Sequence, residues 1–146
     1  MVTIYTQVYT AANKGRTVVI FPEATTSDGS GLLSFHPRLF AAAQASGIPL
    51  QPVALRYGEV DRLDPIAPFI GDDQALAHLW RVLRHPGMQV RAVFLAPFLS
   101  QGLERKALAQ RCRQAIGAVL GMDAETLASA TGMGRFRTGN DKGNAD

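Results

Sequence analysis

The spacing of apolar side chains predicts that the chain opens with a helix and then a strand. Between residues 4 and 13 apolar side chains recur at helical spacing, and Gly15 is a typical helix stop. Residues 17–21, TVVIF, form a β-branched run between Gly15 and Pro22. Such a run is typical of a strand buried on both faces. We therefore expect the first strand at residues 17–21.

The next elements predict the fold class. A helix is expected over residues 37–46, with proline tolerated in its first turn and Gly47 as its stop. A strand is expected over residues 53–57, entered through two prolines. Strand, helix and strand in succession imply a parallel pair. The predicted fold is α/β, with a mainly parallel sheet flanked by helices.

The second half of the chain predicts two more helices and a third strand. Residues 58–71 mix charges with prolines and are expected to form a loop. Asp72 or Asp73 is expected to cap the next helix, a strand should occupy residues 90–95, and Gly121 should end the last helix. Trp80 is expected in the core. The apolar face of the first of these helices consists of Leu76, Leu79, Trp80 and Leu83. The apolar face of the last helix consists of Leu103, Leu108, Cys112, Ile116 and Val119.

Composition is that of a folded globular protein, with 47% hydrophobic and 18% charged residues. The single cysteine, Cys112, excludes an internal disulfide and a multi-cysteine metal site, and it suits a reducing compartment. No apolar run approaches the ~20 residues that a spanning helix needs, and no signal peptide pattern opens the chain.

Basic residues are concentrated between residues 81 and 113, where Glu104 is the only acid. This bias favours an anionic partner, either a membrane surface or nucleic acid, and the alternative is an ordinary solvated helix face. The basic residues are Arg81, Arg84, Arg91, Arg105, Lys106, Arg111 and Arg113.

The loop over residues 22–35, PEATTSDGSGLLSF, carries the candidate chemistry. It follows the expected first strand, and ligands of open α/β sheets bind at the carboxyl ends of strands. The sequence has no phosphate-binding glycine loop ending in Lys-Ser/Thr, no Gly-x-Ser-x-Gly turn, no zinc-binding histidine pair and no Cys-x-x-Cys.

Residues 18–40, together with IPLQPVALRY at residues 48–57, resemble the third and fourth sequence blocks of the 1-acylglycerol-3-phosphate acyltransferase family. The third block reads roughly Phe-Pro-Glu-Gly-Thr-x-Ser after a buried strand, and the fourth is an apolar run through a proline. The Thr-Thr-Ser-Asp-Gly form is most similar to bacterial members, including the lyso-ornithine-lipid acyltransferases. The matching residues are Phe21, Pro22, Glu23, Thr25 and Ser27 for the third block and Pro52, Val53 and Ala54 for the fourth.

The sequence departs from that family at three points. Ala24 stands where the family has glycine, so a positive φ there would be strained. Thr26 stands where many members have an arginine for the acceptor phosphate. The family's first block, a histidine followed five positions later by an aspartate, is absent, because Ala41, Leu83 and Val90 stand five positions after the three histidines.

The resemblance implies a mechanism for the family. Its histidine takes the proton from the lysolipid hydroxyl, which attacks the acyl thioester, and its aspartate orients the imidazole. No catalytic residue is assigned here, and the resemblance implies that the residues present supply the acceptor side. The candidate substrate-binding residues are Glu23, Thr25, Thr26, Ser27 and Arg56.

Each of these residues also has a structural interpretation. Glu23 could be a cap or an ion-pair partner, and the three hydroxyl residues after it could be turn residues. Arg56 could bind an anion, although pairing with Asp61 is favoured. His36 could be a stray base, although a loop histidine is favoured, and Cys112 is expected on an apolar face rather than as a nucleophile.

The sequence therefore predicts a partial acyltransferase domain over residues 1–122 and a disordered tail over residues 123–146. The expected reaction is acyl transfer from acyl-CoA or acyl-ACP to a lysolipid hydroxyl, without a cofactor or a metal. The expected location is cytoplasmic, at the inner face of the cell membrane, with a lysolipid, an acyl donor and an anionic membrane surface as partners and no nucleic acid. The alternative is a non-catalytic lipid- or partner-binding remnant of the same fold.

Overall fold

The structure is a computed structural model that describes residues 2–59, 62–70, 74–122 and 127, with only the backbone described for residues 2–7. The helices, and the strands predicted over residues 53–57 and 90–95, lie close to where the sequence predicts them. The strand predicted over residues 17–21 is absent, and two short strands, at Pro49–Leu50 and Phe98–Leu99, were not predicted. In chain order the elements are α1 (Val2–Asn13), the 3-10 helix η1 (Pro37–Phe40), α2 (Ala41–Ser46), β1 (Pro49–Leu50), β2 (Val53–Tyr57), α3 (Ala75–Leu83), β3 (Val90–Phe94), β4 (Phe98–Leu99) and α4 (Arg105–Val119).

The strands pair as two antiparallel ribbons. β2 pairs with β3, from Val53 opposite Phe94 to Tyr57 opposite Val90, and β1 pairs with β4. The prediction of a mainly parallel sheet was wrong for the described residues. A parallel partner needs a crossover to the opposite end of the sheet, whereas the chain after β2 returns beside the end it left, where the Gly58 N–H donates to the Gln89 carbonyl at 2.9 Å. The fold class is mixed α/β.

Residues 17–21, predicted as the first strand, are irregular chain. Val19 and Phe21 are 75% and 70% exposed, so this apolar run is not buried on both faces. A β-branched run becomes a strand only where a neighbouring strand pairs with its backbone groups. No strand among the described residues pairs with this segment, which explains the incorrect prediction.

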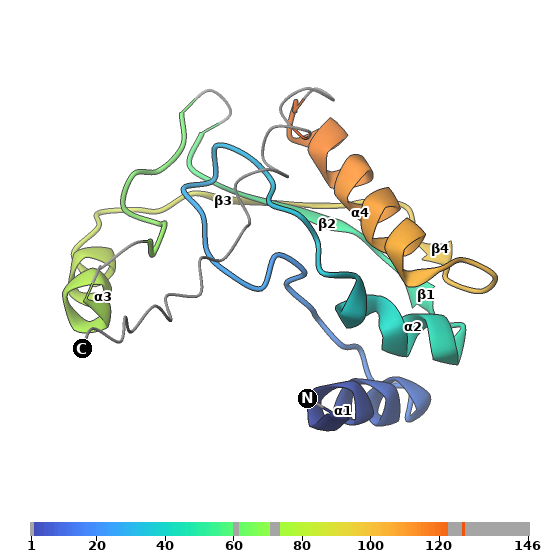
Figure 1. The fold of residues 1–146 in the computed structure, drawn as a ribbon. Coiled ribbons are helices and arrows are strands. Elements are labelled where there is room, and N and C mark those ends of the chain that lie inside the picture. Colours follow the sequence, from blue (N-terminus) through green and yellow to red (C-terminus); the bar gives the residue numbers. More distant parts are fainter. Residues whose placement is uncertain (1, 60–61, 71–73, 123–126, 128–146) are drawn as a thin grey trace, which may run out of the picture.

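The core lies where α4 crosses β2 and the η1–α2 segment (Figure 1). Cys112 is buried there, as the sequence predicts, and burial raises the pKa of its thiol to about 11. Gly47, at φ 63°, ends α2 and donates its N–H to the Ala43 carbonyl at 2.9 Å, as in a typical helix stop. The buried side chains of the core are Phe35, Phe40, Ala54, Leu108, Ala109, Cys112 and Ile116.

α3 has the predicted length but not the predicted environment. Figure 1 shows it set apart from the other helices. Trp80, expected in the core, is 57% exposed, and Leu76 is 82% exposed. Helical periodicity identifies an apolar face but not the surface that covers it, so the core assignment of Trp80 was wrong. Asp72 and Asp73, the predicted caps, lie outside the described residues, as does all of the predicted tail except Leu127.

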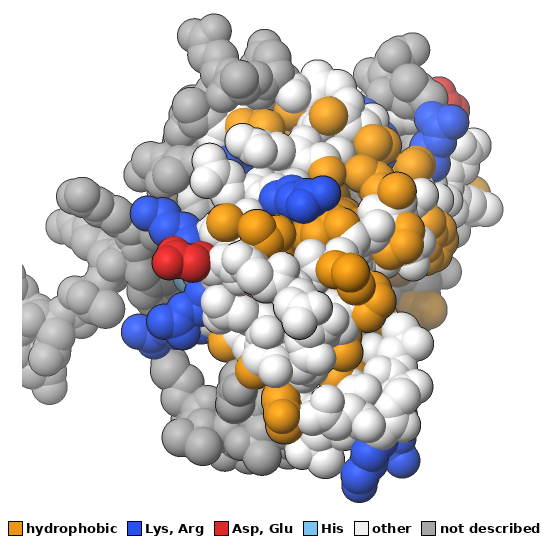
Figure 2. Space-filling view, turned by 90° about the vertical axis from the view of Figure 1, so that its right-hand side faces the viewer, with side chains coloured by type: hydrophobic (Ala, Val, Ile, Leu, Met, Phe, Trp, Pro, Cys, Tyr) orange, Lys and Arg blue, Asp and Glu red, His pale blue; other side chains and the backbone are white. Residues whose placement is uncertain are grey.

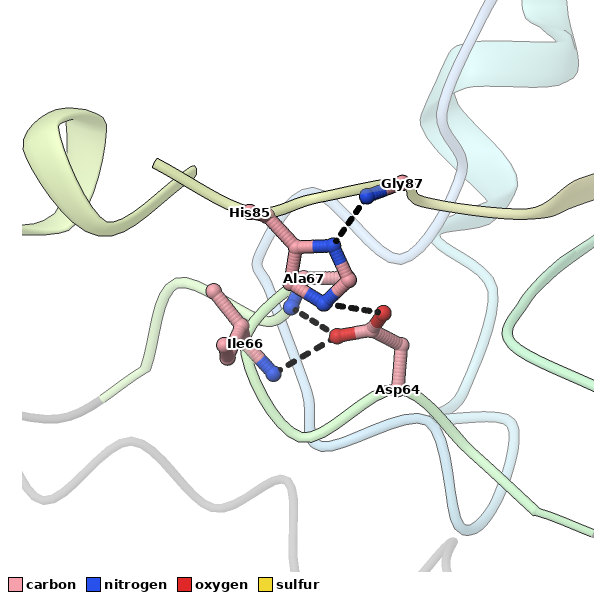
Figure 3. A network of polar contacts seen from close by, with 5 residues as sticks. All are labelled: Asp64, Ile66, Ala67, His85 and Gly87. Carbon is pink, nitrogen blue, oxygen red and sulfur yellow. Dashed lines mark hydrogen bonds and ion pairs between the residues drawn. The ribbon is translucent and has the colours of Figure 1, made fainter. Parts of the chain in front are cut away.

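A polar network anchors the chain on both sides of α3 (Figure 3). Asp64 accepts hydrogen bonds from the N–H groups of Ile66 and Ala67 at 2.8 and 3.0 Å, and its other oxygen lies 3.2 Å from His85 Nε2. The hydrogen bond from Ile66, helped by that of Ala67 and the charge of His85, lowers the pKa of Asp64. His85 Nδ1 accepts a hydrogen bond from the Gly87 N–H at 3.2 Å. The loop before α3 and the turn after it are thus joined.

Candidate functional site

Glu23 lies half-buried at the start of the loop over residues 22–35. Burial raises the pKa of its carboxyl above the usual value, while a hydrogen bond from the backbone of Leu33 and the positive charge of Arg113 act in the opposite direction. A carboxyl with a raised pKa in a polar loop is a candidate functional group, although buried structural carboxyls show the same shift.

Arg113, on α4, holds the far side of this loop. Its Nε donates to the Leu33 carbonyl at 2.8 Å, and one Nη donates to the carbonyls of Leu32 and Leu127 at 2.5 and 2.7 Å. Burial lowers the pKa of Arg113, and the charge of Glu23 opposes that shift. A planar guanidinium with several donors is suited to joining carbonyls from different segments. α4 thereby fixes the loop from the opposite end of the chain.

Ala24, at the position where the family has glycine, adopts the left-handed conformation. Its φ is 55°, the only positive φ of a non-glycine residue in the described part of the chain. The left-handed region brings Cβ close to the following carbonyl oxygen, at a cost of about 1–2 kcal/mol. The loop of this chain therefore has an alanine in a backbone conformation that glycine adopts more readily.

The three hydroxyl residues after Ala24 differ in what they can still bind. Thr26 donates its hydroxyl hydrogen to the Phe69 carbonyl, so it is engaged with the loop that follows β2. Ser27 accepts a long hydrogen bond of 3.4 Å from the Gly29 N–H and keeps its own hydrogen to donate. Thr25 is exposed. Thr25 and Ser27 are thus the better placed donors for a ligand.

Arg56 lies apart from the Glu23 loop. It lines a cavity of about 540 Å³ between the β2–β3 ribbon and the end of α4, and Arg91 lies directly opposite it on β3. Its Nη1 donates to the Leu120 carbonyl at 3.4 Å, and its buried Nε has no hydrogen-bond partner among the described residues. Asp61, the predicted partner of Arg56, lies outside the described residues.

Two of the three histidines have positions that bear on catalysis. His36 is exposed. Its backbone N–H donates to the Pro22 carbonyl at 2.8 Å, so its backbone lies next to the Glu23 loop. His85 has both ring nitrogens engaged, Nδ1 by Gly87 and Nε2 by Asp64 (Figure 3). A general base needs a free nitrogen within reach of the substrate proton. His85 does not offer one in this arrangement.

The basic residues between positions 81 and 113 do not share one face. Arg84 stacks on the Trp80 ring of α3, 4.6 Å from its centroid, and Arg111 of α4 stacks on the Phe98 ring at 4.1 Å. Arg113 points toward the Glu23 loop. Figure 2, which views the end of the molecule with α2, α4 and the β1–β4 pair, shows apolar side chains with scattered basic ones and few acids.

The structure therefore joins only part of the predicted site. Glu23 and Ser27 lie in one loop held by α4, and Thr26 anchors that loop to Phe69. No hydrogen bond or ion pair of the described residues links this loop to Arg56. The sequence analysis treated Arg113 only as one of the basic residues between positions 81 and 113 and missed its contact with the loop. The position of Arg113 among the apolar residues of α4 could have indicated that its side chain faces the rest of the fold.

Two further classes of site are not seen in the described part of the chain. It contains no cluster of three or more His, Cys, Asp or Glu side chains that could hold a metal ion. None of its helices has the length and apolarity needed to cross a bilayer.

The sequence pattern of the acyltransferase family matches residues 2–56, which include the whole Glu23 loop. A lyso-ornithine lipid O-acyltransferase of Pseudomonas aeruginosa is 46% identical over 104 residues, covering 71% of this chain and 40% of that protein. One from Brucella abortus is 33% identical over 120 residues, covering 73% and 45%. A 1-acyl-sn-glycerol-3-phosphate acyltransferase of Neisseria meningitidis is 33% identical over 113 residues, covering 77% and 44%. No solved structure matches the chain significantly.

These matches define the class: the chain belongs to the acyltransferase family. Within it, the named relatives are lyso-ornithine lipid and 1-acylglycerol-3-phosphate acyltransferases, so the resemblance inferred from the sequence is confirmed. The chain spans less than half the length of these three relatives.

Proposed function

We propose that this chain is the acceptor-side part of a lysolipid O-acyltransferase that uses acyl-CoA or acyl-ACP at the inner face of the cell membrane. The observation that carries the proposal is the Glu23 loop, which has the family's Phe-Pro-Glu block and is held to α4 by Arg113. The names of the relatives support a lysolipid as acceptor and lipid synthesis as the setting.

In this proposal the loop binds the acceptor. Glu23 accepts a hydrogen bond from a hydroxyl or ammonium group, and Thr25 and Ser27 donate to a phosphate or carboxylate. Thr26 keeps the loop in place through Phe69. Arg56, with Arg91 across the ribbon, suits an anionic group at the mouth of the cavity, because two like charges directly opposite each other repel unless an anion lies between them.

The transfer itself needs a base that these 146 residues do not supply in the family's form. A base takes the acceptor's proton, the oxygen attacks the thioester carbonyl, the carbon–sulfur bond breaks and the thiol leaves with a proton. No histidine of the sequence is followed five positions later by an aspartate. We therefore expect no measurable acyl transfer by this chain alone, since a positioned base contributes about 10²–10⁴-fold.

The test uses the purified chain with labelled acyl-CoA or acyl-ACP and either lyso-ornithine lipid or 1-acylglycerol-3-phosphate. The Pseudomonas aeruginosa relative is the positive control, and the heat-killed chain is the background. We expect product at the level of the background. Turnover above it would contradict the expectation and would point to His36, whose backbone lies next to the loop; His36→Ala should then remove the activity and His78→Ala should not.

A second candidate is a non-catalytic lipid- or partner-binding remnant, which the missing histidine and aspartate pair favours. Lysolipid binding, measured below the critical micelle concentration, separates the two. Binding weakened several-fold by Glu23→Gln supports an acceptor site. Binding that is indifferent to Glu23→Gln, Thr25→Val and Ser27→Ala supports a remnant whose ligand lies elsewhere.

A further inference from the structure

α3 exposes a complete apolar face. Leu76, Leu79, Trp80 and Leu83 follow the i, i+3, i+4, i+7 spacing of one helix face, and they are 82%, 52%, 57% and 68% exposed. Isolated exposed apolar side chains are ordinary, but a contiguous set of large ones indicates a surface that binds something. The core is built without this helix, because its buried residues come from the segment before β1, from β2 and from α4.

The charges around this face are basic. Arg81 and Arg84 lie at the end of α3, and the helix itself, residues 75–83, contains no acid. The Arg84 guanidinium lies 4.6 Å from the centroid of the Trp80 ring. A tryptophan with an arginine stacked on it places an apolar body and a cation side by side, which is the arrangement found where a protein meets lipid headgroups.

The end of α3 is held in place. His85 follows the helix closely and is joined to Asp64, whose carboxylate also binds the loop before α3 (Figure 3). The Phe69 ring of that loop lies 5.1 Å from the ring of His78, on α3 itself. These contacts with the preceding loop hold α3, and with it the apolar face, in place.

We propose that α3 is an interfacial helix that lies in the surface of an anionic phospholipid bilayer. Its leucines and Trp80 enter the boundary between headgroups and acyl chains, and Arg81 and Arg84 contact lipid phosphates. A second copy of the chain is a poorer partner, because two α3 helices face to face would bring like charges together. The inference rests on the proposed function only in choosing lipid as the partner, since vesicle binding requires no acyl transfer.

Trp80 is the chain's only tryptophan, so its fluorescence reports on α3 alone. The test mixes the purified chain with vesicles of phosphatidylcholine, or of phosphatidylcholine with phosphatidylglycerol, and records sedimentation, emission wavelength and quenching by brominated lipid. With the anionic vesicles we expect the chain to sediment. The fluorescence emission of Trp80 should shift to shorter wavelength and should be quenched by the brominated acyl chains. Salt should weaken binding, because the Debye length is only ~10 Å at 0.1 M.

Two double variants separate the apolar and the charged contributions. Leu76→Ser with Leu83→Ser should lower the partition coefficient by about tenfold or more, because two exposed leucines lose their contact with the acyl boundary. Arg81→Gln with Arg84→Gln should remove the preference for anionic lipid. The controls change exposed residues elsewhere: Leu99→Ser on β4, and Arg105→Gln with Lys106→Gln on α4, both of which should bind as the unmodified chain does.

Several outcomes would overturn the inference. They are sedimentation without any change at Trp80, equal binding to both vesicle types, full binding by the Leu76/Leu83 variant, or a blue shift that grows with protein concentration in the absence of lipid. The last would make a second copy the partner. Lysolipid binding that is weakened by Glu23→Gln, without vesicle binding, would leave the proposed function in place and remove only this role of α3. Vesicle binding without such lysolipid binding would do the reverse.

Discussion

Ala24 has a backbone conformation that an alanine side chain disfavours. Its φ of 55° belongs to the region that glycine occupies without penalty. An alanine there costs about 1–2 kcal/mol, and glycine costs about 0.4–1 kcal/mol through the entropy of the unfolded chain. Ala24→Gly should therefore raise the free energy of unfolding by about 0.5–1 kcal/mol, measured by urea denaturation.

Ala45, exposed on α2, is the matched control for that substitution. Ala45→Gly removes an alanine from an ordinary helical backbone and should lower the free energy of unfolding by about 0.5–1 kcal/mol. If both substitutions destabilised the protein alike, the loop would not be strained at Ala24.

At the scale of elements, Glu23 and Arg113 couple the loop over residues 22–35 to α4. Burial raises the pKa of Glu23 in the folded state, and the charge of Arg113 limits the rise. The folded state therefore holds the Glu23 proton more tightly than the unfolded state does. The stability that the protonated Glu23 carboxyl contributes is therefore fully present below the pKa of the unfolded state and is lost as the pH rises through the pKa of the folded state.

Carbon-13 NMR of the Glu23 carboxyl checks this coupling. The pKa should lie above its ordinary value of 4.5 in the folded chain. Arg113→Gln should raise it further because the opposing positive charge is gone. Arg105→Gln, on an exposed side chain of the same helix, should leave it unchanged. An Arg113→Gln titration identical to that of the unmodified chain would mean that the two elements are not electrostatically coupled.

The elements that the sequence predicted correctly are those set by local pattern. β2 covers residues 53–57 as expected, and α4 buries Leu108, Cys112 and Ile116 from one face, as its periodicity indicates. Gly47 ends α2 at a positive φ, as a helix stop should. These features depend on residues within one or two turns of each other, and a single sequence contains that information.

The errors concern partners distant in the sequence. The β-branched run at residues 17–21 has no neighbouring strand, and the apolar face around Trp80 has no covering layer among the described residues. Pairing direction was wrong for the same reason, since it depends on where the connection from β2 returns. In the candidate site the Glu23 block was recognisable from its motif. The role of Arg113 was not, because its partners lie about 80 residues away.

For the molecule as a whole, the β2–β3 ribbon should promote self-association. One face packs toward α4, and the other exposes Leu55, Tyr57, Val90 and Phe94 at 39%, 44%, 53% and 68%. Each described strand also has one neighbour only, which leaves its other edge unpaired. Exposed apolar faces and open strand edges both favour contact between copies. Sedimentation velocity should show association that increases with protein concentration.

Leu55→Thr with Phe94→Thr should reduce this association and the binding of a hydrophobic dye, because threonine keeps strand propensity while removing apolar surface. Val119→Thr, at a 45% exposed position on α4, is the control and should change neither. If the unmodified chain stayed monomeric at all protein concentrations, the exposed face of the β2–β3 ribbon would not mediate self-association.

The crossing of α4 over β2 also has a consequence during protein synthesis. Phe35, Phe40 and Ala54 depend for their burial on Leu108, Cys112 and Ile116, which are translated more than 50 residues after Ala54. At ~5–20 residues per second, the ribosome needs about 3–12 s to reach them. Throughout that interval the two phenylalanines lack their partners from α4. The nascent first half is therefore the form of this protein most open to chaperone capture or aggregation.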